Sequence, residues 1–197
     1  MNLGTARTEL QARGFDYLPT ARCNTFLNRA LYILNEQESW PFLEKTVSGT
    51  APLTISDLRQ VRYVVAGGSK LAPVDIRDLT DSWPALTDTG TPSYYYYDGT
   101  TLKVYPANAV TISVRYLKTG ADLSVDADAP DLPARYHQMW LDQTVVLAYR
   151  DSDNLEAAAA LQAIVDADVV KMRASFMGRN GDSGELLSLV PGASTDW

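Results

Sequence analysis

The stretch that decides the fold lies near the C-terminal end of the chain. Residues 132–177 read LPARYHQMWLDQTVVLAYRDSDNLEAAAALQAIVDADVVKMRASFM. Pro133 stands in the first turn of a predicted helix, which ends at the polar run 151–154. There Asp153 and Glu156 have the spacing of a capping box. A second predicted helix follows, and so short a connection makes the two an antiparallel hairpin. The apolar stripe of the second helix is Leu161, Val165, Val169, Met172 and Phe176.

The first 40 residues supply a packing partner for this hairpin. A short helix over residues 5–13 is expected to stop at Gly14, and a longer one to open near Thr20. The longer helix carries one apolar stripe at a period of 3.6, formed by Cys23, Phe26, Leu27, Ala30, Leu31 and Leu34. Because the stripes at both chain ends need burial, residues 1–40 and 131–177 are expected to form one helical bundle.

Residues 41–130 are expected to form an antiparallel β-domain inserted between the two parts of the bundle. Short runs rich in Val, Tyr, Ile and Thr alternate there with turn residues: LEKTV, RQVRYVVA, SYYYYD, TLKVYP and TISVRYLK. The clearest unit is a hairpin over residues 94–105 with its turn at 98–100. A short helical turn is expected within residues 74–83. The predicted fold class is therefore α+β.

Residues 178–197, GRNGDSGELLSLVPGASTDW, are expected to form an extended tail. Ordering these 20 residues costs roughly 20–40 kcal/mol. Burial of the large apolar side chains returns only about 10–15 kcal/mol, so the tail is not expected to fold on its own body. We interpret it as an arm that docks on a partner protein or a neighbouring subunit. The residues expected to make this contact are Leu186, Leu187, Leu189, Val190 and Trp197.

Charge and composition exclude several classes of protein. The chain has 17 Lys and Arg against 24 Asp and Glu, a net charge of -7, so it lacks the basic footprint of a tight nucleic-acid binder. Ten of the acidic residues lie in residues 131–197. The N-terminal sequence lacks the apolar core of a signal peptide, and no apolar run is long enough to cross a membrane. We therefore expect neither export by that route nor membrane insertion.

Residues that could carry chemistry are few and lack partners. The chain has one histidine, His137, and one cysteine, Cys23, and neither belongs to a nucleophile or zinc motif. We therefore expect a structural histidine and a buried cysteine rather than an enzyme. Asp126, Asp128 and Asp131 begin like a calcium loop, but the required glycine and glutamate are missing. Residues 67–70, GGSK, indicate a turn. No catalytic residue, metal or cofactor is expected.

The tyrosine-rich strand is the main alternative site. Alternation sends two of its four rings to each face of the sheet, so one pair is expected in the core and the other exposed or at an interface. Exposed rings could instead stack on a sugar or another ligand, which would make the chain a monomeric ligand- or carbohydrate-binding protein. The candidate interface residues are Tyr94, Tyr95, Tyr96 and Tyr97.

Three stretches of the chain, in this order, carry a resemblance to a known family: LNRALYILNEQESWPFLEKT, GTPSYYYYDGTTLKVYPA and DLPARYHQMWLDQTVVLAYRDSDNLEAAAALQAIVDADVVKMR. They resemble the head-to-tail adaptor proteins of tailed bacteriophages. The similarity extends to about Met177. Its most specific pieces are residues 40–43, which close the second helix, residues 90–92 before the tyrosine strand, and Leu132-Pro133 before the helix pair.

The resemblance implies a structural virion protein at the head–tail interface, assembled in the bacterial host cytoplasm. Copies would form a ring, expected to be twelvefold, that binds the portal protein and extends the DNA channel. The ring would present a surface to the next connector or tail protein, and DNA would pass without specific binding. The helical body would build the ring and the C-terminal segment would reach into the portal.

Overall fold

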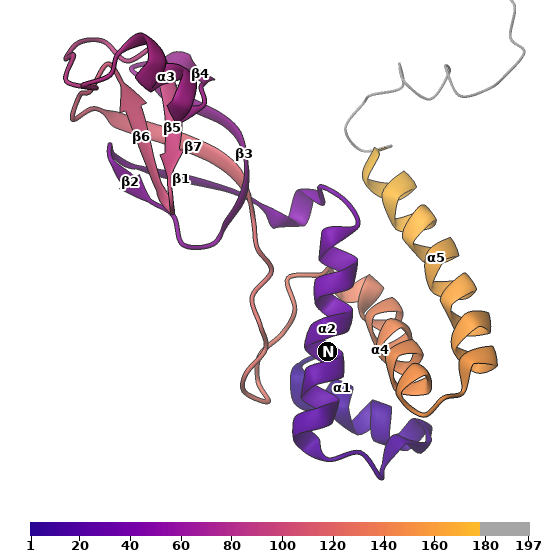
Figure 1. The fold of residues 1–197 in the computed structure, drawn as a ribbon. Coiled ribbons are helices and arrows are strands. Elements are labelled where there is room, and N and C mark those ends of the chain that lie inside the picture. Colours follow the sequence, from indigo (N-terminus) through magenta and orange to yellow (C-terminus); the bar gives the residue numbers. More distant parts are fainter. Residues whose placement is uncertain (178–197) are drawn as a thin grey trace, which may run out of the picture. The chain divides into compact units, whose positions relative to one another are not determined.

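A computed structural model describes residues 1–177 of the chain (Figure 1). The chain divides into two compact units. The first, which we call the helical unit, combines Met1–Leu34 with the residues from Asp122 onward, and the second, the β-unit, is Asn35–Ala121. The helical unit is thus built from both ends of the chain. The mixture of helices and a sheet confirms the α+β class. Within residues 1–177, no helix combines the length and the apolar character that crossing a membrane requires.

The described part of the helical unit contains four α-helices. They are α1 (Leu3–Leu10), α2 (Thr20–Glu36, whose last two residues belong to the β-unit), α4 (His137–Asp151) and α5 (Leu155–Met177). A π-helical segment (Gln11–Phe15) follows α1, and Gly14 within it has a φ of 95°, a conformation that glycine adopts readily. A short 3-10 helix, η3 (Ala134–Tyr136), precedes α4. The expected helices on both sides of the insert are therefore present.

The core of the helical unit is centred on α4. All residues from Gln143 to Ala148 are buried, and Figure 1 shows α4 between α2 and α5. The predicted stripe of α2 is buried along its whole length: Cys23, Phe26, Leu27, Ala30, Leu31 and Leu34. On α5, Val165, Val169 and Met172 are buried as expected, while Leu161 and Phe176 remain partly exposed.

The chain re-enters the helical unit through a loop held by side-chain and backbone hydrogen bonds. Asn28 of α2 binds Leu123 twice, accepting from its amide at 2.8 Å and donating to its carbonyl at 3.0 Å. The amides of Leu3 and Gly4, at the start of α1, donate to the carbonyls of Asp128 and Asp126. The loop therefore supplies acceptors that the first turn of a helix otherwise lacks.

The β-unit is a seven-stranded sheet with the order β1-β7-β3-β4-β5-β6-β2. Its pairs are antiparallel except β4 with β5. The parallel pair became possible because α3 (Ile76–Ser82) and the following loop separate the two strands. The strands are β1 (Glu44–Thr50), β2 (Leu53–Thr54), β3 (Leu58–Ala66), β4 (Ser69–Pro73), β5 (Tyr94–Asp98), β6 (Thr101–Tyr105) and β7 (Thr111–Lys118).

The main core of the β-unit follows the predicted alternation. Ile112, Val114 and Tyr116 of β7 are buried, whereas Thr111 and Arg115 face outward. The β5–β6 hairpin turns at Gly99, which has a φ of 63°, as the residue composition predicted. The run 67–70 makes a turn only at its two glycines, because Ser69 and Lys70 already belong to β4.

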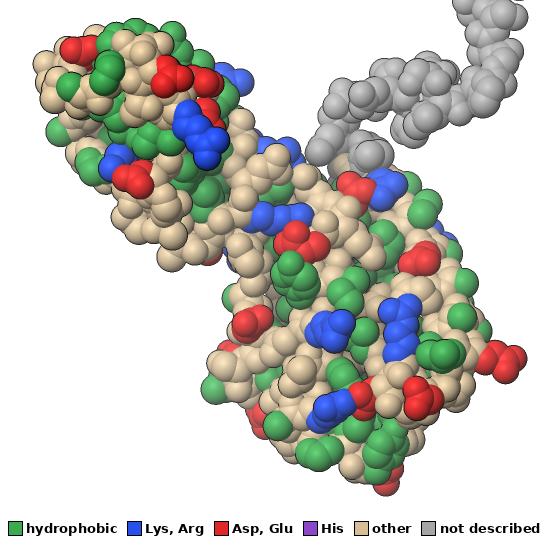
Figure 2. All heavy atoms as spheres, in the orientation of Figure 1, with side chains coloured by type: hydrophobic (Ala, Val, Ile, Leu, Met, Phe, Trp, Pro, Cys, Tyr) green, Lys and Arg blue, Asp and Glu red, His purple; other side chains and the backbone are tan. Residues whose placement is uncertain are grey.

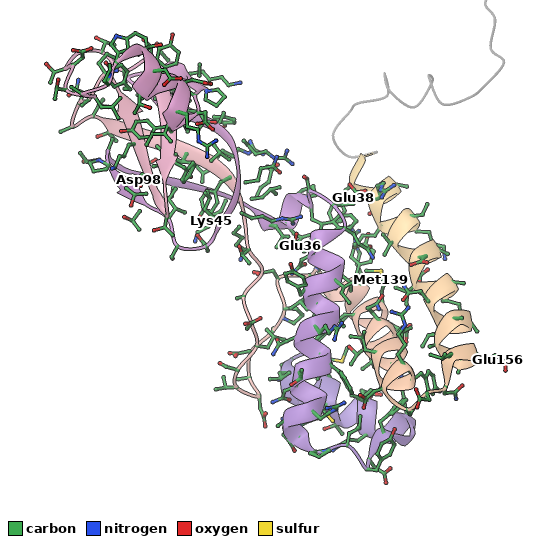
Figure 3. All side chains as sticks on the ribbon, viewed as in Figure 1. Glu36, Glu38, Lys45, Asp98, Met139 and Glu156 are labelled. Carbon is green, nitrogen blue, oxygen red and sulfur yellow. The ribbon has the colours of Figure 1, made fainter. Side chains whose placement is uncertain are left out.

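The expected capping box at the start of α5 is wrong by one residue. Asp153 adopts a φ of 56° and serves as the turn residue. The cap is Asn154, whose side-chain oxygen accepts from the amide of Ala157 at 3.3 Å. Glu156 projects into solvent from the first turn of α5 (Figure 3).

Candidate interaction surfaces

The helix α5 is apolar on two opposite faces. One face packs on α4 through Val165, Val169 and Met172. The opposite face is exposed and recurs at helical spacing; its residues are Ala160, Ala163, Ile164, Ala167, Val170 and Ala174. We call this set the outer stripe. Ile164 is 55% exposed and Val170 is 61% exposed.

The outer stripe is a surface that the sequence analysis missed. Hydrophobic side chains reach the surface over α5 in Figure 2. A helix that is apolar on all sides is usually buried on all sides, yet α5 has a covered face and an open one. The signal was present in the sequence, because Ile164 and Val170 interrupt the polar face that an ordinary surface helix would show.

The ring of His137 is held by contacts within the helical unit. Its Nε2 lies 2.8 Å from the carbonyl of Leu132, and its Nδ1 lies 2.7 Å from the amino group of Met1. Burial, and to a lesser extent the positive charge of that amino group, lower the pKa of His137, although the bond to Leu132 opposes this. Both ring nitrogens therefore have partners within the helical unit, and the ring packs edge-on against Trp140.

Cys23 is fully buried on the inner face of α2. Its sulfur lies 3.7 Å from the carbonyl of Leu18. Burial raises the pKa of the thiol, which outweighs the opposing effect of the Arg7 charge. The thiolate needed for a nucleophile is thus disfavoured.

Two carboxylates of the run that resembles the start of a calcium loop, those of Asp126 and Asp128, have protein partners. Asp126 pairs with Arg7 at 2.9 Å. Asp128 accepts from the amides of Ser124 and Val125, and these hydrogen bonds lower its pKa. Within residues 1–177, no group of three or more His, Cys, Asp or Glu side chains is arranged to hold a metal ion.

The tyrosine strand β5 is mostly interior. Tyr95 belongs to the main core of the β-unit, with Tyr97 packed against it. Tyr96 lies on the other face but is also buried, because Leu79 of α3 and Tyr105 cover it. Tyr94, at 37% exposure, is the most accessible of the four. The expectation that one pair of rings would be exposed is therefore wrong for Tyr96, since α3 covers part of that face.

Several charged side chains form ion pairs that join distant parts of the helical unit. Asp142 and Asp151 of α4 pair with Arg13 and Arg22 from the N-terminal segment, which brings charges from the two chain ends together. On the face in Figure 2, Lys and Arg side chains are interspersed with Asp and Glu. The five tail residues expected to dock, Leu186, Leu187, Leu189, Val190 and Trp197, lie outside the described residues.

Comparison with known sequences places these features in a family. The model of the SU10 adaptor protein family matches residues 1–180. The match covers both parts of the helical unit and the whole β-unit. No curated protein matches the chain.

Proposed function

The chain belongs to the SU10 adaptor protein family, whose members are structural adaptors of phage virions, and on this basis we propose that it forms the adaptor ring between head and tail. Copies of the chain, expected to number twelve, would form a ring on the portal protein. The ring would extend the DNA channel and present the attachment surface for the next connector or tail component. It would assemble in the host cytoplasm and remain in the virion.

The exposed outer stripe of α5 is the observation that carries this proposal. A stripe with Ile164 and Val170 more than half exposed is a surface that association would bury. With 23 residues, α5 is about 34 Å long, so the stripe offers contacts along much of one side of the helical unit. Its alanines also allow a second helix to approach closely.

A second copy of the chain is the occupant that best fits the outer stripe. In a ring every subunit must present contact surfaces to two neighbours, so an adaptor needs apolar surface that its own fold does not cover. Each contact between two copies can be weak, because a closed ring repeats that contact between every pair of neighbours. The exposed charged residues of α5 include both signs, Glu156 and Asp166 against Lys171 and Arg173, and leave no single-sign field that would repel an identical subunit.

We propose that residues 178–197 provide a second attachment, on the portal or on a neighbouring copy. The described residues bury a helical core of their own, and the tail sequence has four clustered aliphatic residues that a partner could bury. Pairing of an extended segment with a partner strand would add main-chain hydrogen bonds to the burial of these side chains.

DNA would pass through the ring without being held. The net charge of -7 opposes tight contact with phosphates. Ten of the 24 acidic residues lie in residues 131–197, the part that would build the ring. If acidic side chains line the channel, their reversal to lysine should slow DNA ejection, whereas charge that serves solubility alone would leave the ejection rate unchanged.

Ligand binding by the tyrosine strand has less support, because Tyr95 and Tyr96 are buried. Electron microscopy of the full chain mixed with the portal protein separates the two functions. Rings attached to the portal would support the adaptor, while a monomer that binds a soluble carbohydrate and ignores the portal would support the alternative.

A further inference from the structure

The sheet of the β-unit has an open position between β3 and β5. The strand β4 pairs with β3 only at residues 64–66 and with β5 only at Tyr94 and Tyr95. It then leaves the sheet, because Asp75 caps α3 by accepting from the amide of Arg77. Beyond this point, β3 is paired with β7 and β5 with β6. Within residues 1–177, no strand pairs with their other edges.

A groove occupies this open position. It has a volume of about 490 Å³ and is lined by residues 58–61 of β3, by residues 73–76 and by residues 95–97 with Gly99. The lining is mainly aliphatic and aromatic; Val61 and Tyr97 are half-buried, and Ile76 is 38% exposed. Figure 3 marks the end of β5 by Asp98. Two strand edges beside one apolar groove are the surroundings that an added β-strand requires.

We propose that this groove accepts residues 185–190 of a second copy of the chain as an added β-strand. The segment reads ELLSLV and ends before Pro191, which cannot continue a paired central strand. In a strand, Leu187 and Leu189 point to one face, and Leu186, Ser188 and Val190 point to the other. We assign the face of Leu187 and Leu189 to the main core of the β-unit, because the centre of the other face is the polar Ser188.

The chain between the described residues and this segment limits how far from the end of α5 the groove of the second copy can lie. Residues 178–184 follow Met177, and seven residues span at most about 25 Å. Their sequence, GRNGDSG, contains no large apolar residue that would compete for burial. The inference rests on the proposed function only for the presence of a neighbouring copy.

Photo-crosslinking of the full chain tests the proposal. A benzophenone amino acid replaces Leu189, and equal amounts of unlabelled and ¹⁵N-labelled protein are mixed and irradiated. Mass spectrometry should locate cross-links from position 189 to residues 58–61 or 95–99 of a copy with the other isotope composition. Cross-links confined to one copy, or to any other part of the partner, would overturn the proposal.

Two variants make the test specific. Leu187→Asp should abolish the cross-link, whereas Ser188→Asp, on the other face of the added strand, should retain it. Equal yields for Leu187→Asp and Ser188→Asp would contradict strand addition.

Failure of this proposal can be told apart from failure of the proposed function. Rings on the portal without the cross-link would overturn the groove contact and leave the adaptor role intact. The cross-link without any ring would support the groove and count against the adaptor ring.

Discussion

The indole nitrogen of Trp140 donates a hydrogen bond of 2.9 Å to the main-chain carbonyl of Leu27, 113 residues earlier in the chain. Both residues are fully buried. The bond joins α4 to the middle of α2, so helices from the two chain ends share one core. In sequence, the β-unit is therefore an insertion between the two parts of the helical unit.

Replacing Trp140 by Phe should lower the free energy of unfolding by about 1–3 kcal/mol, because the buried carbonyl of Leu27 loses its donor and a small cavity forms. Urea denaturation followed by circular dichroism measures the change. The matched control is Trp83→Phe in the β-unit, where the ring is 42% exposed and the expected change is below about 0.5 kcal/mol. Equal losses in the two variants would contradict the role of the bond.

Ile164→Asp and Val170→Asp should prevent ring formation while leaving the subunit folded. Both residues lie on the outer stripe and are more than half exposed, so a carboxylate there is solvated in the monomer and buried only on association. Particle images and thermal unfolding provide the two measurements.

The matched control for the outer stripe is Leu155→Asp. Leu155 is on the same helix and is 65% exposed, but it lies outside the stripe. Rings should persist in this variant. If all three substitutions abolish the ring, the ring depends on exposed apolar area in general rather than on the outer stripe.

The helical unit should lose stability as the pH falls below about 6.5, because burial lowers the pKa of His137 in the folded state. The unfolded chain then binds a proton in a range where the folded chain does not, and stability rises with pH across that range. His137→Gln removes this contribution. The stability difference between the native chain and this variant should therefore narrow between about pH 7.5 and pH 5.5; a constant difference would contradict the assignment.

Ending the chain at Met177 should leave the unfolding free energy unchanged within about 0.5 kcal/mol, because burial of the few large apolar side chains in residues 178–197 does not repay the entropy of ordering them on their own subunit. The same truncation should strongly reduce incorporation into portal-containing heads. Sedimentation of heads followed by quantification of the bound chain measures incorporation. Normal incorporation would refute the docking role of residues 178–197.

Much of the fold could be predicted because the signals are local and periodic. The stripe of α2, the hairpin turn at Gly99 and the alternation in β7 each depend on neighbours a few residues away, and all three are confirmed. The cap of α5 was misassigned by one residue because Asp153 and Asn154 are both good capping residues. Only the backbone conformation of Asp153 distinguishes them.

What could not be predicted depends on contacts between distant residues. The burial of Tyr96 requires α3 to lie over β5, and the short β4 is defined by its parallel partner rather than by its own sequence. The groove beside Tyr97 likewise exists because β4 ends early between two longer strands. Such features arise from the topology, which the periodicity of a single sequence does not reveal.

The most direct test of the adaptor role is single-particle cryo-electron microscopy of the full chain incubated with the portal protein of its phage. We predict a closed ring of this chain on the portal, with the outer stripe of α5 buried between adjacent copies and a central channel wide enough for duplex DNA. A chain that stays monomeric beside an undecorated portal, or a ring in which Ile164 and Val170 remain exposed to solvent, would contradict the account.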